Sequence, residues 1–104
     1  ALQLVVNIPE KLKKTKKVVP MALQLLLENA IKHNIVSRTK PLVVRFVAEE
    51  EQLTVANSYQ PKISKEKGAG LGLANIRKRY GLYTKRPVVT YMKDNEFIVI
   101  IPLI

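Results

Sequence analysis

The chain has 104 residues, of which 47% are hydrophobic, which is enough for one small domain with a modest core. It has no cysteine and one histidine, so disulfides and thiolate metal sites are excluded, and no apolar run reaches the ~20 residues of a membrane span. Its 18 Lys+Arg outnumber 8 Asp+Glu, and the net charge of +10 suits an anionic partner: nucleic acid, a membrane surface, an acidic protein or a nucleotide.

The first third of the sequence predicts a strand, a basic connection and a helix. Residues 2–8 alternate apolar and other side chains, as a strand does. Residues 11–17, KLKKTKK, hold five lysines with no aromatic residue among them, so we expect an exposed, mobile connection rather than a nucleic-acid site. Pro20 suits the opening of a helix that should run to about Asn34. The predicted strand follows directly on Ala1, so we expect a fragment of a longer chain.

The rest of the sequence predicts two hairpins separated by a loop and a second helix. A polar loop over 59–70 should precede a helix over 71–80, with Gly81 as its C-cap. The four expected strands are 42–48 and 53–58, joined by the acidic turn 49–51, then 87–92 and 97–103, joined at Asp94–Asn95. This order predicts a two-layer α+β sandwich, a mostly antiparallel sheet with helices on one face, as a single domain over residues 1–104.

The first predicted helix carries a polar arc. At about 100° per residue, an apolar arc faces the sheet and consists of Leu23, Leu26, Leu27, Ala30 and Ile31. The opposite arc holds Glu28, Asn29, Lys32 and His33. Taken alone, this arc indicates a solvent-facing surface with a Glu28–Lys32 pair at i,i+4.

The glycines suggest a different use for this arc. Three of the four glycines in the chain are Gly68, Gly70 and Gly72, at the junction between the predicted loop and the second helix. Glycines let backbone N–H groups approach an anion closely, and the start of a helix adds unpaired donors and a positive dipole end. The pattern fits a phosphate cradle, although a plain turn would also use glycines.

Two motifs resemble the GHKL ATPase superfamily. ENAIKHN, residues 28–34, is similar to its asparagine box, and GAGLGLANIRKRY, residues 68–80, is similar to its second glycine box. From about residue 2 to its end, the chain looks most like the catalytic domain of LytS-type bacterial sensor histidine kinases. The resemblance implies a Bergerat-like ATP-binding fold that lacks its N-terminal helix here.

The resemblance also implies roles for the polar residues. Asn29 would ligate Mg²⁺ on the triphosphate of ATP, Lys32 would reach a phosphate, and His33 would lie beside the nucleotide. Glu28 matches the position that activates water in hydrolytic members, which makes it a candidate catalytic residue. The implied phosphate-binding positions of the glycine box are Gly68, Gly70, Leu71 and Gly72.

The sequence departs from the family where an Asp-x-Gly box is expected. Asn57 stands at the position of the adenine-reading Asp, and Tyr59 stands at the Gly position. An amide oxygen still accepts a hydrogen bond from an amino group, but more weakly than a carboxylate does. The segment that would close over the phosphates, 58–67, is short and carries Ser64, Lys65 and Lys67.

The resemblance therefore implies the ATP-binding domain of a two-component sensor histidine kinase. It would supply ATP and Mg²⁺ for phosphorylation of a histidine on a separate helical domain of the parent chain or its dimer mate, with a response regulator downstream. The parent is expected to be an inner-membrane homodimer with this domain in the cytoplasm, and no nucleic-acid partner is expected. Two alternatives stay open: a degenerate GHKL-like module that binds partners without nucleotide turnover, and a basic nucleic-acid-binding α+β domain.

Overall fold

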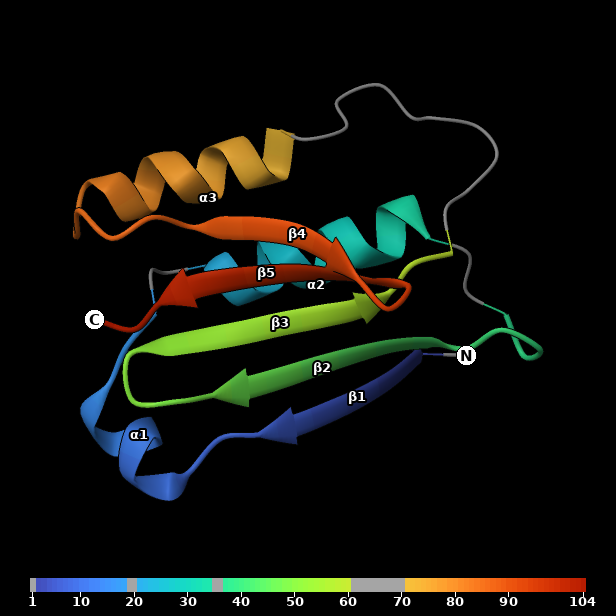
Figure 1. Cartoon of the computed structure of the whole chain (residues 1–104), viewed down its shortest axis with the longest axis horizontal. Coiled ribbons are helices and arrows are strands. Elements are labelled where there is room, and N and C mark those ends of the chain that lie inside the picture. Colours follow the sequence, from blue (N-terminus) through green and yellow to red (C-terminus); the bar gives the residue numbers. More distant parts are fainter. Residues whose placement is uncertain (1, 19–20, 35–36, 61–70) are drawn as a thin grey trace.

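The computed structural model describes residues 2–18, 21–34, 37–60 and 71–104 (Figure 1). Within these ranges the chain forms five strands and three helices. In chain order they are β1 (Leu2–Asn7), α1 (Glu10–Thr15), α2 (Ala22–His33), β2 (Leu42–Ala48), β3 (Gln52–Ser58), α3 (Leu71–Gly81), β4 (Val89–Lys93) and β5 (Glu96–Pro102). None of the helices in the described ranges is long and apolar enough to cross a membrane.

The five strands form one mixed sheet in the order β1-β2-β3-β5-β4. Strand β1 runs parallel to β2, whereas the other three neighbouring pairs are antiparallel. Helices α2 and α3 pack against each other over one face of this sheet (Figure 1). The prediction of an α+β sandwich with a mostly antiparallel sheet is confirmed.

The core lies between the sheet and the two long helices. Alternate residues of β2, which are Leu42, Val44, Phe46 and Ala48, are buried. The antiparallel register sets Val44, Phe46 and Ala48 opposite Asn57, Val55 and Leu53 of β3, so these side chains share one face. Ile76 and Tyr80 of α3 fill the space above that face.

Helix α2 buries a stripe that differs from the predicted one. Ala22, Leu26 and Ala30, spaced by four residues, are fully buried. Leu23 and Leu27 pack against the core only in part, and Ile31 is 39% exposed, so the prediction that Ile31 faces the sheet is wrong. The two alanines let the helix approach the sheet closely, and the buried stripe is therefore rotated away from Ile31 and toward Asn29.

The lysine run is not the mobile connection that the sequence suggested. Residues 10–15 form α1, in which Leu12 is buried against the core while its neighbouring lysines are exposed. Lys17 exchanges two backbone hydrogen bonds with Ile104, at 2.7 and 2.8 Å, which fixes the chain just after the helix. One buried leucine and these two bonds are enough to order a highly charged segment.

The chain turns largely follow the predictions. Asp94 and Asn95 have φ of 51° and 61°, as the two-residue turn of a hairpin requires. Helix α3 ends at Gly81, where the sequence predicted its end, although the φ of Gly81 lies outside the left-handed region that C-cap glycines commonly adopt. The turn is closed instead by hydrogen bonds from the N–H groups of Tyr83 and Thr84 to the Tyr80 carbonyl, both 3.0 Å long.

Candidate functional site

Three elements bring the candidate residues to one end of the molecule. In Figure 1, α2 and β3 end on the same side of the molecule, and α3, which packs against α2, has its first turn at the end that faces that side. Asn34, just after α2, is only 4% exposed and joins two of these elements. Its Nδ2 donates to the Ala30 carbonyl at 2.9 Å, and its Oδ1 accepts from the backbone N–H of Gln60 at 2.8 Å.

Asn29 lies at the edge of the buried stripe of α2 and is half-buried. Within the described part of the chain, no hydrogen bond engages its side chain, so the amide is available to a ligand. Lys32, one turn further along, is exposed. Glu28 is also exposed, and its Oε1 accepts from Gln24 Nε2 at 3.1 Å, a contact typical of a solvated helix surface.

Asn57 occupies the core face of the last part of β3. It is 5% exposed, and its Nδ2 donates to the Ser58 carbonyl at 3.0 Å. Its Oδ1 accepts no hydrogen bond from the described residues, so this oxygen keeps its capacity to accept one. Tyr59 is 50% exposed, and its backbone N–H donates to the Asn95 carbonyl at 2.8 Å. The strand end is therefore fixed while the Tyr59 ring is accessible.

The glycine box is only partly described. Gly68 and Gly70 lie outside the described residues, as do the predicted lid residues Ser64, Lys65 and Lys67. Leu71 and Gly72 are the first two residues of α3, so a helix does begin directly after the glycines. His33 is the last residue of α2, and its side chain lies outside the described part of the structure.

The described side chains of the site suit an anionic ligand better than a metal ion coordinated by protein groups alone. Among the described residues, no group of three or more His, Cys, Asp or Glu side chains could hold a metal ion. A Mg²⁺ ion bound by Asn29 would therefore need phosphate oxygens and water as its other ligands, which is how this ion is commonly held with nucleotides. The half-buried Asn29 amide, the exposed Lys32 amine and the start of α3 fit that kind of ligand set.

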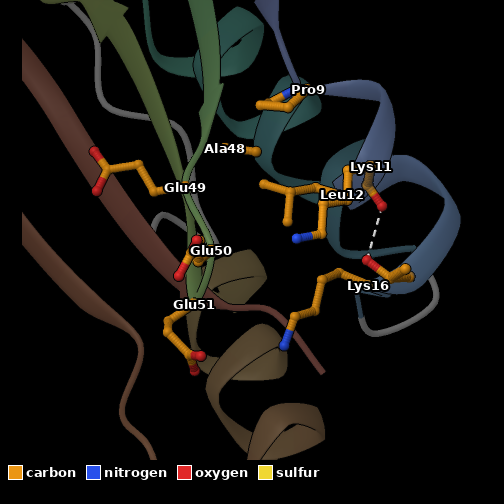
Figure 2. A pocket seen from close by; sticks show the side chains of 9 residues that line it. Pro9, Lys11, Leu12, Lys16, Ala48, Glu49, Glu50 and Glu51 are labelled. Atoms are coloured by element: carbon orange, nitrogen blue, oxygen red, sulfur yellow. Dashed lines mark hydrogen bonds between the residues drawn. The ribbon is translucent and has the colours of Figure 1, made fainter.

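A separate hollow of about 490 Å³ lies at the other end of the molecule, between α1 and the turn joining β2 to β3. Figure 2 shows Lys11 and Leu12 of α1, and Lys16 just after it, across from the turn residues Glu49, Glu50 and Glu51. No ion pair joins these lysines to these glutamates in the structure as described. Because Asn29 and Asn57 are at the opposite end, this hollow is not part of the candidate site.

Sequence reasoning missed two polar residues that hold the site together. The sequence predicts Asn34 only as the end of a helix, because its burial depends on the path of a distant strand. Ser58 Oγ accepts from the Val43 N–H at 3.0 Å and thereby secures the end of β3 beside β2. The sequence holds no local signal for either contact, because each joins segments at least fifteen residues apart.

Comparison with known proteins adds no relative to this picture. A scan against models of known protein families finds no match to the sequence, and a search of curated proteins finds none either.

Proposed function

We propose that this chain is an ATP-binding domain of the GHKL type and serves as the catalytic domain of a LytS-type sensor histidine kinase. The observation that supports it best is that α2 and β3 end on the same side of the molecule, where the Asn34–Gln60 hydrogen bond links them. The half-buried Asn29 belongs to α2 and the buried Asn57 to the last part of β3, and α3 begins in the sequence directly after Gly68 and Gly70.

In this proposal the chain acts by holding and orienting ATP. Asn29 Oδ1 binds Mg²⁺, which neutralises charge on the phosphates when it is present. Backbone N–H groups around Leu71 and Gly72 hold phosphate oxygens, and Lys32 adds a positive charge. Asn57 Oδ1 accepts a hydrogen bond from the adenine amino group, and the exposed Tyr59 ring lies beside the base. The γ-phosphoryl group is then oriented for in-line attack by an imidazole from outside this domain.

The proposal places the domain in a larger signalling protein. The phosphorylated histidine lies on a helical domain of the parent chain or its dimer mate, and a response regulator receives the phosphoryl group. The parent is a membrane-bound homodimer, with this domain on the cytoplasmic side. The 104-residue chain alone should not label itself with the γ-phosphate of ATP, and acid-labile phosphate on His33 would contradict this.

Calorimetric titration tests the proposed site. ATP with Mg²⁺ should bind the parent chain, and Asn29→Ala should abolish the Mg²⁺-dependent part of binding while circular dichroism stays unchanged. Gln24→Ala is the matched control, because it removes an exposed amide from the same helix one turn before Glu28. If the Asn29→Ala variant binds ATP–Mg²⁺ as the parent does, Asn29 is not a metal ligand.

A second candidate is a degenerate module of the same fold that binds a partner without turning over nucleotide. The residues that favour it are Asn57 and Tyr59, which stand where the family places Asp and Gly. Absence of adenine-nucleotide binding in both the parent and the Asn57→Asp variant would favour this module. The nucleic-acid-binding alternative, motivated by the net charge of +10, predicts instead a steep salt dependence of DNA or RNA binding.

A further inference from the structure

The turn after α3 presents two adjacent apolar side chains to solvent. Leu82 is 81% exposed and Tyr83 is 61% exposed, the highest values for large hydrophobic residues in the described part of the chain. A single exposed leucine is ordinary on a protein surface, but two neighbours at one protruding turn form a small apolar tip.

The backbone fixes this tip in place. The N–H groups of Leu82 and Tyr83 donate to the carbonyls of Arg79 and Tyr80, at 3.1 and 3.0 Å. The Tyr80 side chain is buried in the core and anchors the turn on that side. On the other side, Arg86 Nη1 donates to the Glu51 carbonyl at 2.8 Å. The two apolar side chains are therefore displayed by an ordered support.

The chain segment that carries the tip is basic, and it contacts one acidic side chain, Glu51, through Arg86. Residues 71–93 contain six Lys+Arg and no Asp or Glu, so this stretch supplies much of the net charge of +10. Two of these cations are engaged: Arg77 donates to Thr90, and Arg86 is paired with Glu51 at 3.3 Å. Lys78, Arg79 and Lys85 are exposed on the two sides of the tip.

We propose that the Leu82–Tyr83 tip docks the domain onto an anionic lipid surface. Leucine inserts into the boundary between headgroups and acyl chains, and tyrosine is favoured at the same depth because its ring is apolar and its hydroxyl is polar. Lys78, Arg79 and Lys85 would then lie at the level of the anionic headgroups, where each basic residue adds to the attraction.

The geometry favours a lipid surface over other anionic partners. A stable protein interface needs roughly 800 Å² on each side, which a tip of two residues does not supply. Single-stranded nucleic acid is held by aromatic side chains on which successive bases stack, and a leucine beside one tyrosine is not such a platform. A bilayer, in contrast, accepts a convex tip by insertion.

This docking is independent of the proposed nucleotide site. The tip follows the C-terminal end of α3, whereas the implied phosphate-binding residues Leu71 and Gly72 are at its N-terminal end. A nucleotide could therefore bind while the domain lies on the membrane, and vesicle binding should not require ATP.

A tryptophan reporter tests insertion directly, because the chain contains no tryptophan. The Leu82→Trp variant should show a blue-shifted emission with phosphatidylcholine vesicles that contain phosphatidylglycerol, and no shift with pure phosphatidylcholine. Tyr91→Trp, at an exposed position of β4, is the control and should show no shift with either. If the Leu82→Trp variant co-sediments with the anionic vesicles but its emission does not shift, the proposal is overturned.

Co-sedimentation with the same anionic vesicles separates insertion from general charge attraction. Leu82→Ser with Tyr83→Ser should weaken binding at least about tenfold, since both apolar side chains are lost. The double variant Lys78→Gln with Lys85→Gln should weaken vesicle binding by about fivefold for each charge removed. The control is Lys11→Gln with Lys14→Gln on α1, which removes the same charge away from the tip and should weaken binding less. Equal losses in the two charge variants would overturn the proposal. The proposal would also be overturned if the chain bound duplex DNA as tightly as it binds the vesicles and the two serine substitutions did not weaken that DNA binding.

Discussion

Asn34 Oδ1 accepts a hydrogen bond from the backbone N–H of Gln60 at 2.8 Å, and this contact links the end of α2 to the chain leaving β3. The same amide donates to the Ala30 carbonyl, so both of its polar atoms are used. The helix that carries Asn29 and the strand that carries Asn57 are thereby held in one relative position. A nucleotide that touches both would find its two contacts already arranged.

Removal of the Asn34 amide should therefore destabilise the fold. We predict that Asn34→Ala lowers the free energy of unfolding by about 1–3 kcal/mol, because it removes a buried side chain and leaves the part-buried Gln60 N–H without this acceptor. Urea denaturation followed by circular dichroism measures the change. Asn7→Ala, at an exposed position of β1, is the control and should stay within about 0.5 kcal/mol of the parent. Equal stability of the Asn34→Ala and parent chains would mean that this link does not form.

The buried stripe of α2 makes a second prediction. Leu26→Ala should cost about 2–5 kcal/mol of unfolding free energy, because Leu26 is fully enclosed between helix and sheet. Ile31→Ala should cost much less, since that side chain is more than a third exposed. Leu27 is half-buried and should fall between the two. The same denaturation experiment gives all three values, and a larger loss for Ile31→Ala than for Leu26→Ala would show that the helix is rotated differently.

The sequence predicted the parts of this fold that depend on local patterns. Strands β2 and β3 are rich in Val, Leu, Phe and Thr, and Asp94–Asn95 form the expected hairpin turn. Both signals lie within a few neighbouring residues. The buried stripe of α2 was predicted in part: Leu26 and Ala30 belong to the predicted arc, but Ala22 does not, because an alanine weighs little in a hydrophobic pattern. The helix α1 was missed because lysines mask its one buried residue, Leu12.

The sequence indicated the candidate residues of the site but not the contacts that hold their helices and strands in place. The motifs that resemble the GHKL family indicated Asn29 and the glycines, and the position of its Asp-x-Gly box indicated Asn57. Nothing in the sequence shows that β1 pairs in parallel with β2, or that Asn34 reaches Gln60. Those contacts depend on where distant segments pack, which only the folded chain determines.

The adenine-reading position gives a third prediction. Asn57→Asp should tighten ATP binding or leave it unchanged, because a carboxylate accepts a hydrogen bond from an amino group more strongly than an amide does. The gain should be at most about 1–2 kcal/mol. GTP, which presents a carbonyl there, should bind no better, so calorimetry should show a wider preference for ATP. If Asn57→Asp changes neither affinity, Asn57 does not contact the base.

The glycine box gives a fourth prediction, made from the sequence alone because Gly70 lies outside the described residues. Gly70→Val should block ATP binding, since a β-branched side chain would occupy the space of a phosphate and resists positive φ. The measurement is the same calorimetric titration, with circular dichroism to confirm the fold. Unchanged affinity would mean that the glycines serve only as a turn.

The central claim is that ATP binds where α2, β3 and α3 meet, and amide chemical shifts recorded during a titration with ATP and Mg²⁺ test it most directly. We predict that the shifted amides cluster at residues 28–34, 57–60 and 71–74, with little change in α1 or at residues 49–51. No shifted amides at saturating ATP, or shifts confined to α1 and the turn at 49–51, would contradict the proposed site.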